Sequence, residues 1–185
     1  MLLTGLLPDI STDPAIETAT DSVEAGRSGT IVAPVGIRPP LLAAVASRAA
    51  TPLVVLTATG RDAESLTNAL ASWIPGVAML PAWETLPHER LSPQVDTMAR
   101  RIAVLRRLVH PITGDDSAGP ISVLVVPIRA FLQPIISGLA DLEPVRVRTG
   151  DILDLTETTN CLAELGYERV DMVEGRGQMS VRGGI

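Results

Sequence analysis

The segment best placed to bind a nucleotide phosphate is residues 33–40, which follow the first predicted strand and read Ala-Pro-Val-Gly-Ile-Arg-Pro-Pro. A phosphate-binding (Walker A) loop needs two glycines, a lysine and a hydroxyl, because backbone N–H groups and the lysine charge hold the phosphates. This segment has one glycine, and its three prolines have no backbone N–H. All 15 basic residues of the chain are arginine, which also excludes a lysine Schiff base or general base. We expect no nucleotide site, no cofactor and no catalytic residue.

Two acidic pairs offer the residue types that bind a divalent cation. They are Asp62 with Glu64, and Asp115 with Asp116. Charged residues at helix starts and in loops are usually solvated. We therefore interpret both pairs as surface charges and expect no metal site.

His88 lies between two carboxylates, Glu84 and Glu89, and could take part in acid–base chemistry. No nucleophile is nearby in the sequence and prolines bound the segment, so a packing loop is the favoured interpretation. Cys161 is the one cysteine, which excludes an internal disulfide and a zinc site made of thiolates. We expect Cys161 to be a small residue on a helix.

Three arginines stand out near the end of the chain. Arg169, Arg176 and Arg182 lie in or beside two short predicted strands, residues 167–174 and 178–185, which flank a glycine-rich turn. That pattern predicts a β-hairpin. The planar guanidinium suits paired hydrogen bonds to carboxylates, so binding to an acidic partner protein is one interpretation. Ordinary scattered surface arginines are the other.

The elements that would position these residues alternate between strands and helices. The predicted strands are residues 30–33, 52–57, 77–80 and 121–126. The predicted helices are residues 39–50 and 59–73, a longer one that begins at Pro93 with Ser92 as its N-cap, and short ones at 128–132 and 134–139. This alternation predicts an α/β fold with a parallel sheet up to about residue 130. Because 46% of the residues are apolar and 2% aromatic, the core must consist of Leu, Val, Ile and Ala. The runs at 52–57 and 121–126 are typical of strands buried on both faces.

A second, small α+β lobe is predicted from about residue 135. It contains a strand at residues 144–148, a helix with Leu155 and Leu162 on one face and Gly166 just beyond its end, and the hairpin. The predicted domains are an acidic, poorly ordered or helical segment (1–28), an α/β domain (29–134) and a partial small lobe (135–185).

The net charge of −6 argues against a general nucleic-acid coat. Arg100, Arg101, Arg106 and Arg107 would spread around their helix, so we expect weak DNA binding at most. The first residues carry neither a signal peptide pattern nor a membrane span, which predicts a cytoplasmic location. The chain stops at Ile185 within a strand pattern, which favours a truncated fragment.

Two segments carry a family resemblance. Residues 80–93 (Leu-Pro-Ala-Trp-Glu-Thr-Leu-Pro-His-Glu-Arg-Leu-Ser-Pro), followed by Asp96 and Arg101, resemble the N-terminal region of transcription-repair coupling factors (Mfd). Residues 166–185, from Gly-Tyr-Glu-Arg-Val-Asp to Val-Arg-Gly-Gly-Ile, are similar to the domain 2 pattern that this family shares with UvrB. The resemblance covers roughly residues 30–185.

The resemblance implies a degenerate copy of UvrB: a helicase-like α/β lobe with a degenerate phosphate loop and no ATP site, then part of a domain 2-like lobe that recruits UvrA. It places Arg169, Arg182 and Arg176 at UvrA-binding positions. It further implies a non-enzymatic adaptor whose other partners, RNA polymerase and the remaining domains, belong to the full-length protein. Two alternatives stay open: a UvrB or helicase relative that hydrolyses a nucleotide, and an unrelated small α/β enzyme with its site at the carboxyl ends of the strands.

Overall fold

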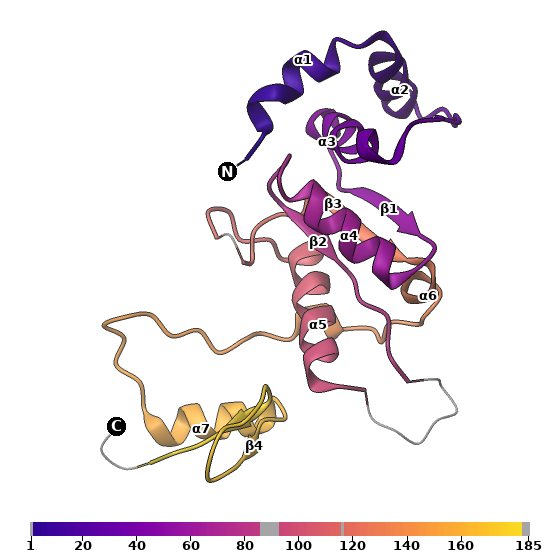
Figure 1. Cartoon of the computed structure of the whole chain (residues 1–185). Coiled ribbons are helices and arrows are strands. Elements are labelled where there is room, and N and C mark those ends of the chain that lie inside the picture. Colours follow the sequence, from indigo (N-terminus) through magenta and orange to yellow (C-terminus); the bar gives the residue numbers. More distant parts are fainter. Residues whose placement is uncertain (1, 86–92, 116, 183–185) are drawn as a thin grey trace.

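A three-stranded parallel sheet forms the centre of the computed structural model, which describes residues 2–85, 93–115 and 117–182 (Figure 1). Its strands are β1 (Leu53–Thr57), β2 (Val77–Met79) and β3 (Val123–Pro127), in the order β1-β3-β2. In the register of the sheet, Leu53 of β1 and Val77 of β2 both pair with Val123 of β3. The predicted α/β class with a parallel sheet is confirmed.

Seven α-helices lie in the described part of the chain. They are α1 (Leu7–Ser11), α2 (Pro14–Glu24), α3 (Arg38–Arg48), α4 (Gly60–Leu70), α5 (Val95–Val109), α6 (Ile128–Phe131) and α7 (Leu155–Glu164). Side chains cap three of them, because Asp13, Thr59 and Asp154 each accept a backbone N–H at the helix start. Short 3-10 turns add Thr4–Leu6, Val35–Ile37 and Leu139–Asp141.

The core has a layer of helices on each face of the sheet. Val123 and Val125 of β3 pack with Ala43 of α3 and with Ala63 and Leu70 of α4. On the opposite face, Leu124 and Val126 of β3 pack in one cluster with Val104 of α5 and Ala130 of α6. β3 is buried at all five positions, as its apolar sequence predicted.

β1 differs from the prediction that both of its faces would be covered. It is an edge strand with alternating burial, and Val54 and Leu56 are 50% and 48% exposed. Its apolar run resembles that of β3, but the position of a strand in the sheet, and not its composition, decides whether helices reach both faces.

Three other predicted elements are absent from the described residues. Residues 30–33 form no strand, and Val32 is 96% exposed. Residues 144–148 form no strand either, and in both segments β propensity is not matched by a neighbouring strand that could complete the hydrogen bonds. Residues 134–139 form no helix, because Gly138 adopts a left-handed conformation (φ 81°) before the turn Leu139–Asp141.

The start of α5 also differs from the prediction. The helix begins at Val95 with Gln94 as its N-cap residue, and no side chain caps it. The predicted N-cap, Ser92, lies outside the described residues. At the N-terminal end, α1 and α2 pack on α3, and Arg48 pairs with Asp21 and Glu24 at 3.1 and 2.9 Å. None of the helices in the described ranges combines the length and the apolar character that a membrane crossing requires.

Candidate functional site

In the arginine-bearing C-terminal lobe, the end of α7 directs the chain into a strand. Gly166 follows the helix with φ 87°, a conformation that favours glycine. The N–H of Tyr167 donates to the carbonyl of Leu162, and that of Gly166 to the carbonyl of Ala163, both at 3.0 Å. This is the Schellman arrangement, so the predicted helix end is confirmed.

The predicted hairpin is wrong in its strand direction. β4 (Glu168–Arg169) and β5 (Gln178–Met179) pair in parallel. The N–H of Glu168 donates to Gly177 O at 2.8 Å, and the N–H of Val170 donates to Met179 O at 2.9 Å. The intervening loop turns twice, and the side-chain oxygen of Gln178 holds it by accepting the N–H groups of Glu174 and Gly175 at 2.8 and 3.0 Å. A glycine-rich turn signals a reversal of the chain, but it does not show how often the chain reverses.

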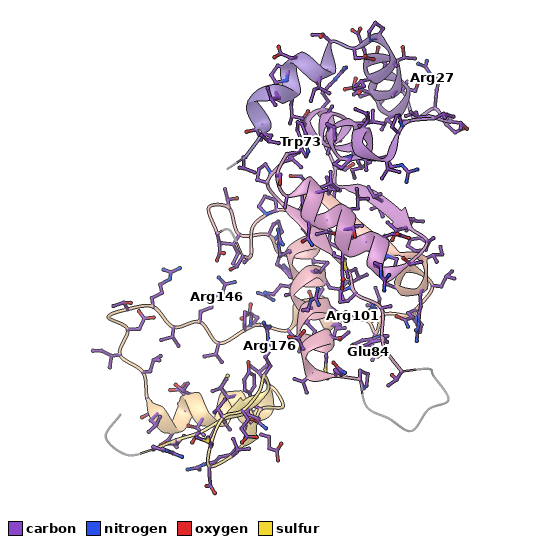
Figure 2. All side chains as sticks on the ribbon, in the orientation of Figure 1. Arg27, Trp73, Glu84, Arg101, Arg146 and Arg176 are labelled. Atoms are coloured by element: carbon purple, nitrogen blue, oxygen red, sulfur yellow. The ribbon has the colours of Figure 1, made fainter. Side chains whose placement is uncertain are left out.

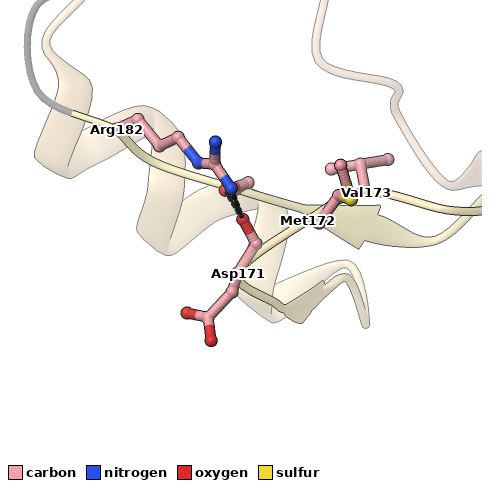
Figure 3. Close-up of a pocket in the computed structure, with 5 residues that line it drawn as sticks. Asp171, Met172, Val173 and Arg182 are labelled. Atoms are coloured by element: carbon pink, nitrogen blue, oxygen red, sulfur yellow. Dashed lines mark hydrogen bonds between the residues drawn. The ribbon is translucent and has the colours of Figure 1, made fainter.

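The structure places the three candidate arginines in different settings. Arg169 lies in β4 and is exposed, with no side-chain hydrogen bond or ion pair to another described residue. Arg182 follows β5 and donates from Nη2 to the carbonyl of Asp171 at 2.7 Å (Figure 3). Arg176, in the turn before β5, pairs through Nε with the carboxylate of Asp96 on α5 at 3.0 Å.

The Arg176–Asp96 pair connects this lobe to the first turn of α5. A Cβ added at Gly177, which has φ 80°, would lie 2.9 Å from Cγ1 of Val95, so the turn also packs against the start of that helix. The two charged side chains are 67% and 52% exposed, and such exposed pairs contribute between about 0 and 1 kcal/mol. Arg176 is thus engaged within the chain, a contact that the sequence pattern did not reveal.

A shallow cavity of about 340 Å³ lies beside Arg182. Asp171, Met172, Val173, Ser180 and Arg182 line it (Figure 3). The carbonyl of Asp171 accepts two hydrogen bonds, from Arg182 and from the hydroxyl of Ser180 at 3.0 Å. Sequence reasoning identified the arginine but missed the adjoining apolar pair, because Met172 and Val173 lie in a loop without periodicity.

A second cavity, of about 460 Å³, lies at the carboxyl ends of the three central strands. Its lining includes Thr59, Glu64, Trp83, Glu84, Arg100 and Arg129. The alternative of an unrelated α/β enzyme required a pocket at this place, although the strand ends offered little chemistry in the sequence. The hydroxyl of Thr59 is bonded to the carboxylate of Asp62, and that of Thr97 to the carboxylate of Glu84. Carboxylates and guanidinium groups therefore share this cavity, and both threonine hydroxyls are already engaged. Gly36, the glycine of the degenerate loop, does not line either cavity.

Residues 81–85 are fixed to α5 by a buried arginine. Arg101 is 1% exposed, and its Nη1 donates to the carbonyl of Pro81 at 2.6 Å. Its guanidinium lies 4.4 Å from the ring centroid of Trp83, and Figure 2 labels Arg101 on α5. The hydroxyl of Thr97 donates to the Glu84 carboxylate and holds the pKa of that group below its usual value. Three residues of the family motif, Pro81, Trp83 and Arg101, thus contact one another.

Three of the four arginines of α5 that were considered for DNA contact bind within the chain and do not form a common outer face. Arg101, Arg106 and Arg107 donate to backbone carbonyls, those of Pro81, Leu142 and Gly119, at 2.6, 2.9 and 2.8 Å. Arg100 is exposed. Three of the four positive charges considered for DNA contact therefore have partners inside the chain.

The candidate metal-binding and acid–base residues do not form a common site in the described part of the chain. Asp62 bonds to its own N-cap threonine, and Asp115 accepts the hydroxyl and N–H of Ser117. Across residues 2–85, 93–115 and 117–182, no three His, Cys, Asp or Glu side chains group as metal ligands. Asp116, His88 and Glu89 lie outside these ranges. Cys161 is exposed on α7, a helix as predicted.

Comparison with known proteins gives two kinds of match. Residues 145–185 match the family described as the UvrB interaction domain. A transcription-repair-coupling factor of Mycobacterium bovis is 46% identical over 159 residues, which cover 84% of this chain and 12% of the relative. Those of Escherichia coli and Bacillus subtilis are 26% and 27% identical over 147 residues, covering 78% and 77% of this chain and 12% of each relative. The chain thus spans 12% of the length of these curated relatives. Over the stretch that aligns, the chain therefore belongs to the family of transcription-repair-coupling factors.

Proposed function

We propose that this chain is the N-terminal adaptor region of a transcription-repair coupling factor and that its C-terminal lobe binds UvrA. Through that contact it would bring nucleotide excision repair to a stalled RNA polymerase. The observation that carries the proposal is the match of residues 145–185 to the UvrB interaction domain. The same residues include all three candidate arginines.

Charge-assisted hydrogen bonds from arginine to acidic groups of UvrA would supply the specificity. Arg169 supports this role because its exposed side chain is unpaired with any described residue. Arg182 uses one N–H for the Asp171 carbonyl, and the guanidinium has five such donors. Arg176 would have to exchange Asp96 for an acidic group of the partner, so we assign it a smaller share of the binding energy.

The proposal assigns no ATPase to this chain. A phosphate site would need a cation beside a run of free backbone N–H groups. The degenerate loop instead carries prolines, and its Gly36 is exposed in a 3-10 turn that follows no strand. Measurable ATP binding at the second cavity would instead favour the nucleotide-dependent alternative.

A titration of the 185-residue chain with UvrA tests the proposal. We expect Arg169→Ala combined with Arg182→Ala to weaken binding strongly, since truncating a buried, paired interface arginine costs about 2–5 kcal/mol. Arg38→Ala combined with Arg61→Ala is the matched control, because it removes two exposed arginines outside the matched region. Equal affinity of the first double variant and the wild type would refute the assigned arginine roles.

A further inference from the structure

The loop after β4 displays two apolar side chains that are not packed in a core. Met172 and Val173 are 65% and 51% exposed. They line the cavity that also contains Arg182 (Figure 3). Both belong to the stretch that matches the UvrB interaction domain. Methionine and arginine are both enriched in the cores of protein interfaces relative to the rest of the protein surface.

Hydrogen bonds hold this pair in place although β4 has already ended. The carbonyl of Asp171, directly before Met172, accepts from both Ser180 and Arg182 at 3.0 and 2.7 Å. Both donors lie in the segment directly after β5. The chain therefore fixes the backbone next to Met172 before any partner arrives, which lowers the entropy cost of binding.

The guanidinium of Arg182 is available to a partner in the same place. In Figure 3 the carboxylate of Asp171 points away from Arg182, and only its carbonyl receives the hydrogen bond. No ion pair joins Arg182 to another described residue. A carboxylate of the partner would therefore meet a positive charge that the chain itself has not neutralised.

We propose that Met172 and Val173 form the apolar anchor of the partner-binding surface, and that it receives an apolar side chain flanked by a carboxylate that pairs with Arg182. The occupant is the partner of the proposed function, on which this inference rests. Methionine suits such a contact because its flexible thioether adapts to the shape of the partner side chain. Arg182 then has two tasks: it positions the loop through the Asp171 carbonyl, and it binds the partner's carboxylate.

Titration of the 185-residue chain with UvrA, monitored by calorimetry, tests this anchor. We expect Met172→Ala combined with Val173→Ala to weaken binding about tenfold or more, as removal of a central apolar contact does. Met172→Leu keeps the apolar volume and is expected to bind within about threefold of the wild type. The matched control is Ile152→Ala, since Ile152 is 99% exposed in the same matched stretch but does not line the cavity.

The outcomes separate this inference from the proposed function. If the Met172/Val173 double variant binds like the wild type while the Arg169/Arg182 double variant binds weakly, the anchor is refuted and the UvrA role stands. If Ile152→Ala weakens binding as much as the double variant, the anchor is likewise refuted, because exposure alone would explain the loss. If the wild type does not bind UvrA, the proposed function fails and the anchor with it.

Discussion

Arg101 is the buried charge on which the position of residues 81–85 depends, and its removal gives the sharpest test of the structure. The side chain is 1% exposed and lies over the ring of Trp83. Burial lowers the pKa of its guanidinium, which nevertheless stays charged at neutral pH because arginine starts from so high a value. We consider the replacement of Arg101 by alanine.

The expected loss of stability follows from the contacts that disappear. The hydrogen bond from Nη1 to the Pro81 carbonyl involves a charged donor and is worth about 1.5–3 kcal/mol. The contact with Trp83 adds up to about 2 kcal/mol at a desolvated site. Against these gains stands the cost of burying the charge, which is increased because Nε of Arg101 has no hydrogen-bond partner among the described residues. We therefore expect Arg101→Ala to lower the free energy of unfolding by about 3 kcal/mol.

Urea and thermal unfolding followed by circular dichroism measure this loss. For a chain of this size, about 3 kcal/mol corresponds to a decrease in Tm of about 6–12 °C. Arg100→Ala is the control, since Arg100 is the exposed neighbour on the same helix and its loss should stay within about 0.5 kcal/mol. Arg101→Met should fall between the two, because it refills the space and removes the unpaired Nε. Equal stability of Arg101→Ala and Arg100→Ala would refute the reasoning.

Three further predictions concern a pH dependence, a helix end and an exposed ion pair. Because the Thr97 hydroxyl lowers the pKa of Glu84 in the folded state, this bond stabilises the protein above the unfolded pKa of the carboxyl and is lost as the pH falls through the folded value. The stability difference between wild type and Thr97→Val in urea unfolding should therefore shrink between about pH 5 and pH 3. Gly166→Ala should cost about 1 kcal/mol in the same assay, since φ is 87° at this position; an unchanged midpoint would contradict the left-handed helix end. A double-mutant cycle of Asp96→Asn and Arg176→Ala should give a coupling energy below about 1 kcal/mol that decreases in salt, and a larger value would mean that the pair is more shielded than the structure shows.

Local sequence signals were sufficient where one residue type satisfies one local requirement. The glycine after α7 was predictable because it fills a position at a helix end that few other residues can fill. β3 was predictable from an apolar run long enough for a strand buried on both faces. The strands predicted at residues 30–33 and 144–148 do not form, because a strand exists only where another strand completes its hydrogen bonds.

For the candidate site, too, the sequence identified residues but not the contacts that they make. The composition of the C-terminal stretch identified Arg169, Arg176 and Arg182 as candidates, yet it could not distinguish their settings. Only the structure showed that Arg176 reaches Asp96, some distance away in sequence, and that Arg182 holds the backbone before Met172. Neither contact leaves a periodic pattern in the sequence, since both join loops to other segments.

The sequence by itself determined the type of core, the parallel sheet, the end of α7 and the family, because apolar runs, the glycine after a helix and sequence motifs are properties of neighbouring residues. Tertiary structure decided which strand lies in the centre of the sheet, that β4 and β5 run in parallel, and that three arginines of α5 donate to carbonyls of the chain itself. Those outcomes depend on which distant segments can reach one another. The local sequence around a charged or apolar side chain does not indicate which distant group that side chain will contact.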